Sequence, residues 1–177
     1  GLDQTQSGVE LAWIYDAGGR PSDATEIGLE AFSSSPAIRS GRVYVPSSGG
    51  RVHAISLSAT PDANGQVNAE WVFPDPAKQE TPLSAFRFST PATPAVQNFV
   101  FCGSTGGVLH SIKDNGASAA LDDNFAQPNF YAPIQSSVAL DLQNIYIGTM
   151  GTDGDDGGVW WVNRSNGLPA DPVGGLQ

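Results

Sequence analysis

The fold of this chain is decided by a stretch that reads Ser35-Pro36-Ala37-Ile38, then Val43-Tyr44-Val45, then Gly50-Arg51-Val52-His53-Ala54-Ile55. Apolar residues alternate with other types over short runs, which is the period of a half-buried β-strand. Glycine and serine separate the runs, and both residues favour tight turns. The stretch therefore predicts three short strands in succession.

The same pattern returns twice further along the chain. The second copy occupies 93–96, 99–101 and 107–112, and the third occupies 136–139, 145–147 and 157–162. The middle strand recurs after 56 and 46 residues, and the glycine before the third strand recurs after 57 and 50 residues. Periods near 50 residues with several short strands in each are typical of β-propeller blades.

A fourth strand is expected in each blade. Trp71-Val72-Phe73, preceded by Gly65, supplies it in the first repeat, and a weak strand near 117–125 follows the second. The third repeat ends at Asn166-Gly167 with no tryptophan after it, whereas an orphan strand at 8–15 precedes the first repeat. An open sheet edge favours pairing, so the orphan strand is a candidate to complete the last blade.

We therefore expect one all-β domain over 1–177, built of about three blades of four-stranded antiparallel sheet. Blade one spans about 35–73, blade two about 93–125, and blade three about 136–167 plus strand 8–15. Propeller rings typically need about 4–8 blades. Either two chains meet in a six-bladed ring, or this chain is a piece of a longer one.

The third repeat carries a family resemblance. Gly157-Gly-Val-Trp-Trp-Val-Asn-Arg-Ser-Asn-Gly167 resembles the core of the pyrroloquinoline-quinone (PQQ)-type repeat, roughly Gly-x-Leu-Tyr-Ala-Leu-Asp-x-x-Thr-Gly. The spacings Gly65 to Trp71 and Gly8 to Trp13 resemble the tryptophan-docking motif that follows this core. The resemblance covers about 33–167 and strand 8–15, although Ser56 and Asn163 replace the usual acidic residue. It implies a docking role between blades for Trp13 and Trp71, with Gly65 and Gly167 as the glycines of the motif. Adjacent strand residues point to opposite faces, so we also expect Trp160 to dock against a neighbouring blade.

Composition excludes several classes of function. Only 15% of the 177 residues are charged, and the formal net charge is −10. This charge disfavours nucleic-acid binding and anionic membrane surfaces. No apolar run approaches the roughly 18 residues of a membrane helix, so we expect no membrane insertion. The low lysine content, with only Lys78 and Lys113, resembles that of exported proteins, which points to an extracellular or periplasmic location.

The sharpest local motif is Thr152-Asp153-Gly154-Asp155-Asp156-Gly157-Gly158. The carboxylates of Asp153, Asp155 and Asp156 could converge on Ca²⁺, which takes six to eight oxygen ligands. The simpler interpretation is a solvated acidic hairpin turn, because Asp and Gly are good turn formers. We expect no cofactor; Ca²⁺ is the one ion that this loop could bind, and PQQ is not expected.

Two histidines and one cysteine suggest catalysis at first sight. His53 and His110 occupy the same repeat position, where the third repeat has Trp160, which favours a recurring packing role. Cys102 aligns with Pro46 and Gly148, a position that favours a small residue. A nucleophile needs a positioned base and an orienting group, and the sequence identifies neither. We therefore predict no catalytic residues.

Three functions compete. The first is a non-catalytic, exported binding or scaffold module. The second is a fragment of a quinoprotein dehydrogenase, although the resemblance implies eight blades and usually adjacent cysteines for such enzymes. The third is a structural subunit of an extracellular assembly. We favour the first, with a protein partner or self-association through the open edges at 8–15 and 159–163.

Overall fold

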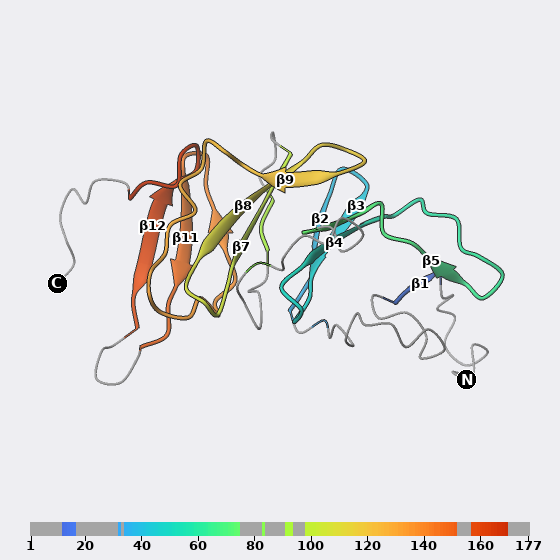
Figure 1. Cartoon of the computed structure of the whole chain (residues 1–177), viewed down its shortest axis with the longest axis horizontal. Helices are drawn as coiled ribbons and strands as arrows, with labels where there is room; N and C mark the ends of the chain where they lie inside the picture. The colour runs from blue at the N-terminus through green and yellow to red at the C-terminus, as the bar shows by residue number, and fades with distance from the viewer. Residues whose placement is uncertain are drawn as a thin grey trace.

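The computed structural model describes residues 12–16, 32, 34–74, 83, 91–93, 98–151 and 157–169. Every regular element in these ranges is a β-strand, which confirms the all-β prediction (Figure 1). None of the described residues forms a helix that could span a bilayer. The strands are β1 (Ile14–Tyr15), β2 (Ala37–Arg39), β3 (Arg42–Pro46), β4 (Val52–Ser56), β5 (Gln66–Val67), β6 (Trp71–Phe73), β7 (Phe99–Gly103), β8 (Leu109–Asp114), β9 (Ala119–Leu121), β10 (Ala139–Leu140), β11 (Asn144–Gly148) and β12 (Val159–Asn163).

Ten of the described strands form three antiparallel sheets that follow one another in the chain, and β1 and β5 form a separate two-stranded parallel sheet. The first sheet has the order β2-β3-β4-β6, the second β7-β8-β9, and the third β10-β11-β12. Isolated bridges extend the second sheet at Ala92 and the third at Ile134. Each sheet is an up-and-down meander, which is the architecture of a propeller blade. Figure 1 shows the three sheets in a row, with the third at one end.

The second sheet is buried on both faces because its side chains alternate between its two neighbours. On β7, Val100 and Cys102 pack against the first sheet, while Phe101 packs against the third. The core between the first and second sheets contains Tyr44, Val52, Ala54, Trp71, Val100, Cys102 and Ile112. The core between the second and third contains Phe101, Leu109, Phe125, Ile134, Val138, Ile145, Ile147 and Val162.

The cross-strand register corrects the alignment of the repeats. Opposite pairs are Val45 with His53, Cys102 with His110, and Ile147 with Trp160. Cys102 is therefore equivalent to Val45 and Ile147, and the expected match with Pro46 and Gly148 is wrong by one residue. Gly50 and Gly107 are 57 residues apart, and so are Val45 and Cys102. The turn at the glycine fixes which residues face each other, so the glycine gives the correct alignment of the repeats. Two consequent sets of equivalent positions are Tyr44, Phe101 and Tyr146, and Val52, Leu109 and Val159.

The N-terminal strand does not complete the last blade. β1 pairs in parallel with β5, through Ile14 opposite Gln66 and Tyr15 opposite Val67. The hydroxyl of Tyr15 lies 2.7 Å from Nδ1 of His53, on the face of the first sheet that points away from the second. The strand thus finds a polar and aromatic partner within its own chain, which corrects the expectation for its described part. Residues 8–11 lie outside the described residues.

The chain beyond Gly167 returns to the outer edge of the third sheet. Asn163 donates its backbone N–H to the carbonyl of Leu168 at 2.8 Å, and Pro169 bridges Val162. The last blade was expected to end without an outer strand. Over the described residues, this bridge places the chain where such a strand would begin.

A loop at 126–134 ties the third sheet to the second. Leu109 donates its N–H to the carbonyl of Pro128, and Phe130 donates to the carbonyl of Gly107, at 3.0 and 2.8 Å. Gly107 has a φ of +82°, and a Cβ there would lie 3.0 Å from the backbone nitrogen of Ala132. Glycine is therefore required both by the turn and by the close approach of the loop.

Truncation of the core should reveal how much the stacking of sheets stabilises the fold. Ile112 is fully buried between the first and second sheets. We expect Ile112→Ala to lower the free energy of unfolding by about 2–5 kcal/mol, through lost burial and a residual cavity. Ile38→Ala is the matched control, because Ile38 is 64% exposed and its truncation should change stability by no more than about 0.5 kcal/mol. Urea unfolding of both variants measures the difference, and equal losses would contradict the assignment of the core.

Candidate functional site

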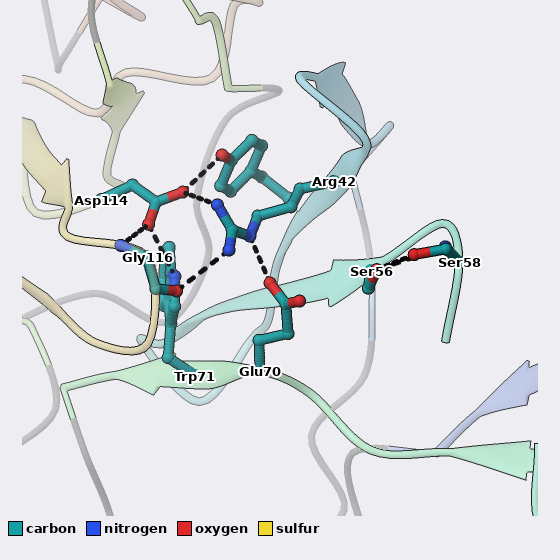
Figure 2. A network of polar contacts seen from close by, with 8 residues as sticks. Arg42, Ser56, Ser58, Glu70, Trp71, Asp114 and Gly116 are labelled. Atoms are coloured by element: carbon teal, nitrogen blue, oxygen red, sulfur yellow. Dashed lines mark hydrogen bonds and ion pairs between the residues drawn. The ribbon is translucent and has the colours of Figure 1, made fainter. Parts of the chain in front are cut away.

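A buried carboxylate joins the first and second sheets. Asp114 lies at the end of β8 and is 3% exposed. Its Oδ2 accepts hydrogen bonds from the Tyr44 hydroxyl at 2.6 Å and from Nη1 of Arg42 at 3.3 Å (Figure 2). Its Oδ1 accepts from Nε1 of Trp71 at 3.1 Å and from the N–H of Gly116 at 2.8 Å. Both oxygens are thus satisfied, as burial of a carboxylate requires.

Arg42 supplies the opposite charge from the first sheet. Its Nη2 donates to the carbonyl of Gly116 at 3.2 Å, and its Nε pairs with the carboxylate of Glu70 (Figure 2). The hydrogen bond to Glu70 raises the pKa of Arg42, burial opposes that shift, and the charge of Asp114 adds to it. Burial and then the hydrogen bond to Asp114 raise the pKa of Tyr44. Arg42 therefore stays charged and Tyr44 stays neutral near neutral pH.

An open cavity of about 540 Å³ adjoins this network. It lies where β3 and β7 begin and β8 ends, beside the turn at 114–118. The lining includes Arg42, Asn98, Phe99, Lys113, Asp114 and Asn115. The polar and charged residues among them are suited to holding a ligand by hydrogen bonds and charge.

The structure places Cys102 directly opposite His110, a juxtaposition that the misaligned repeat concealed. Cys102 is fully buried, and burial raises the pKa of its thiol to about 12. Burial also lowers the pKa of His110 to about 4, while a hydrogen bond to Gln127 acts in the opposite direction. A neutral thiol and a neutral imidazole that solvent does not reach are poorly suited to nucleophilic chemistry.

His53 occupies the equivalent position in the first sheet and is also buried. The ring of Phe32 meets the His53 ring edge-on, with centroids 5.5 Å apart. The aromatic ring of Tyr15 lies 5.7 Å from the His53 ring. His53 and His110 therefore both sit in packed interiors, on different sheets.

The residues that the sequence singled out for metal binding, Asp153, Asp155 and Asp156, lie outside the described residues. Within the described ranges, no group of three His, Cys, Asp or Glu side chains is close enough to hold a metal ion. The Ca²⁺ site stays a prediction.

The residues that the sequence singled out for docking lie in different surroundings. Trp71 is buried in the core between the first and second sheets, and Trp13 is half-buried beside β1. Trp160 is 48% exposed, and its ring lies 5.7 Å from Phe130 on the 126–134 loop. Gly65 closes a turn with φ +77° and open space around it, whereas a Cβ on Gly167 would lie 2.9 Å from the Phe125 ring.

Comparisons with known proteins return fold likeness alone. No family model and no curated protein matches the chain. Among solved structures, the computationally designed Ika8 protein is similar with a TM-score of 0.53 and 11% identity, over 80% of this chain and 36% of that chain. BamB from Moraxella catarrhalis is similar with a TM-score of 0.38 and 11% identity, over 75% of this chain and 45% of that one. The chain thus spans about a third to under a half of the length of these structures.

Removal of the Asp114 carboxylate should weaken the junction of the first two sheets. We expect Asp114→Ala to lower the free energy of unfolding by about 3–5 kcal/mol, because Arg42 loses a buried partner and the Tyr44 and Trp71 donors lose their acceptor. Asp141→Ala is the matched control: Asp141 also accepts a tyrosine hydroxyl, that of Tyr146 at 2.7 Å, but it is exposed. Chemical denaturation compares the two, and a loss for Asp114→Ala no larger than the control's would contradict the role of Asp114.

His110 should make stability depend on pH in a defined window. The unfolded chain protonates this imidazole below its ordinary pKa of 6.5, whereas the folded chain resists protonation until about pH 4. Between these values the unfolded state binds more protons, so stability falls as the pH falls from 6.5 to 4, by about 3 kcal/mol in all. Denaturant midpoints measured at pH 7 and pH 4.5 should differ less for His110→Phe than for the native chain. An unchanged pH dependence would refute the assignment.

Proposed function

We propose that this chain is a non-catalytic scaffold module that binds a second copy of itself through the uncovered face of its third sheet. This face carries Tyr146, Val159 and Trp161, which share one side because their backbone positions alternate in register. The opposite side of the same sheet, with Ile145 and Val162, packs against the second sheet. Within the described part of the chain, this uncovered face is one of the two end faces of the row of three sheets.

The observation that carries the proposal is a difference in burial at equivalent positions. Val52 and Leu109 are fully buried between sheets, whereas Val159 in the third sheet is 76% exposed. Trp161 is 36% exposed on the same face, and Tyr146 is half-buried.

The exposed residues have the apolar character of the sheet-to-sheet cores. The first sheet offers Tyr44 and Val52 to the second, and the second offers Phe101 and Leu109 to the third. The third sheet presents the same kind of surface to solvent. Exposed apolar patches of this kind mark interaction sites.

The resemblance to PQQ-type repeats supports the interpretation of this chain as an exported scaffold. The antiparallel blades supply a rigid support, on which loops and faces bind partners without catalysis. The low lysine content and the net charge of −10 agree with export. We propose an extracellular or periplasmic module of this type, with PQQ absent from its function.

Analytical ultracentrifugation at rising concentration tests the proposal. The measurement is made in about 1 M NaCl, where the Debye length is about 3 Å. The salt then screens the repulsion between copies that each have a net charge of −10. We expect the average mass to rise with concentration. The double variant Val159→Ser, Trp161→Ser should associate at least about tenfold more weakly, because it removes the exposed apolar surface.

Leu57→Ser is the control, since Leu57 is 46% exposed in the turn after β4, away from the proposed face. This variant should associate like the native chain. A constant monomer mass over the whole concentration range would show that the uncovered face does not bind a second copy.

A further inference from the structure

We infer that the cavity between the first and second sheets binds a neutral, hydroxyl-rich small molecule of the saccharide class. This inference is independent of the self-association proposed above, because the cavity and the uncovered face lie on different sheets. The cavity is formed by the start of β3, the start of β7 and the end of β8. Its volume of about 540 Å³ falls within the range of small-molecule sites, about 300–1,000 Å³.

The walls offer polar groups that nothing in the described part of the chain engages. Asn98, Lys113 and Asn115 line the cavity, and all three residues are exposed. Among the described residues, none of these three side chains makes a hydrogen bond or ion pair. Each amide offers both donors and an acceptor, and the ammonium offers donors. This combination matches sugar hydroxyl groups, which donate and accept in turn.

The charge at the cavity favours a neutral ligand. Arg42 and Lys113 bring two positive charges to the lining and Asp114 brings one negative charge, and Glu70 pairs with Arg42 beside the cavity. An anion would be disfavoured by the two carboxylates and by the −10 charge of the whole chain. A cation would be disfavoured by Lys113 and Arg42. A mainly apolar ligand would leave the amides and the ammonium unpaired.

The floor of the cavity is held in place before any ligand arrives. Asp114 and Arg42 are fixed by the hydrogen bonds described above, and Asp114 donates its backbone N–H to the carbonyl of Asn98 at 2.8 Å. Asn115 donates its N–H to the carbonyl of Ser118 at 2.9 Å, which closes the neighbouring turn. The backbone that carries all three wall residues is thus ordered, and this reduces the entropy lost on binding.

Nuclear magnetic resonance titration with maltose, cellobiose and trehalose tests the inference. We expect at least one of these disaccharides to shift the backbone amide signals of Asn98, Lys113 and Asn115 in a saturable way. The double variant Asn98→Ala, Asn115→Ala should weaken that binding about 30-fold, which corresponds to the loss of two hydrogen bonds at about 1 kcal/mol each. Lys113→Met should also weaken disaccharide binding.

Asn124→Ala is the matched control, because it removes an exposed amide in the segment after β9, and Asn124 does not line the cavity. Its binding should equal that of the native chain. Thermal unfolding confirms that each variant is folded.

Three outcomes would overturn the inference. The first is that none of the three disaccharides gives saturable shifts up to about 50 mM, which would mean a Kd above that concentration. The second is binding that the double variant leaves unchanged. The third is a stronger response of the same amides to sodium acetate or choline chloride, which would assign the cavity to a charged ligand.

Discussion

The carboxylate of Asp114 is the constraint on which the junction of the first and second sheets depends. A buried charge is costly unless donors surround it, and here the donors come from two sheets. Tyr44, Trp71 and Arg42 all belong to the first sheet, whereas Asp114 belongs to the second. The first sheet therefore cannot rotate or slide without breaking several bonds at once. Two members of this network, Arg42 and Asp114, also line the adjoining cavity.

The second sheet shows how the rest of the stack follows from alternation. Val100 and Cys102 point one way on β7, and Phe101 points the other way, so one strand contributes to two cores. A sheet of this kind needs a neighbour on each side. Among the described strands, the third sheet has such a neighbour on only one side, and Val159 and Trp161 are exposed to solvent on the other.

The repeating strand pattern in the sequence was sufficient to predict the all-β class, the antiparallel meanders and the outer strand at Trp71. Periodicity reports which residues are apolar, but Phe99, Val100, Phe101 and Cys102 are all apolar, so it could not fix the register of β7. The contacts of Asp114 were beyond prediction because its four partners are scattered along the chain. The parallel pairing of β1 with β5 was also missed, since a strand of two residues has no periodicity to read. The Ca²⁺ loop stays untested.

The two junctions between the three sheets are held by different kinds of hydrogen bond. Between the second and third sheets, the 126–134 loop lies against Gly107 and is tied down by backbone hydrogen bonds, in a space that admits no side chain at that glycine. Between the first and second sheets, side-chain bonds around Asp114 carry the polar connection. A point substitution can therefore remove the polar connection of the first sheet, whereas the connection through the loop is made by backbone groups that every residue type except proline possesses in full.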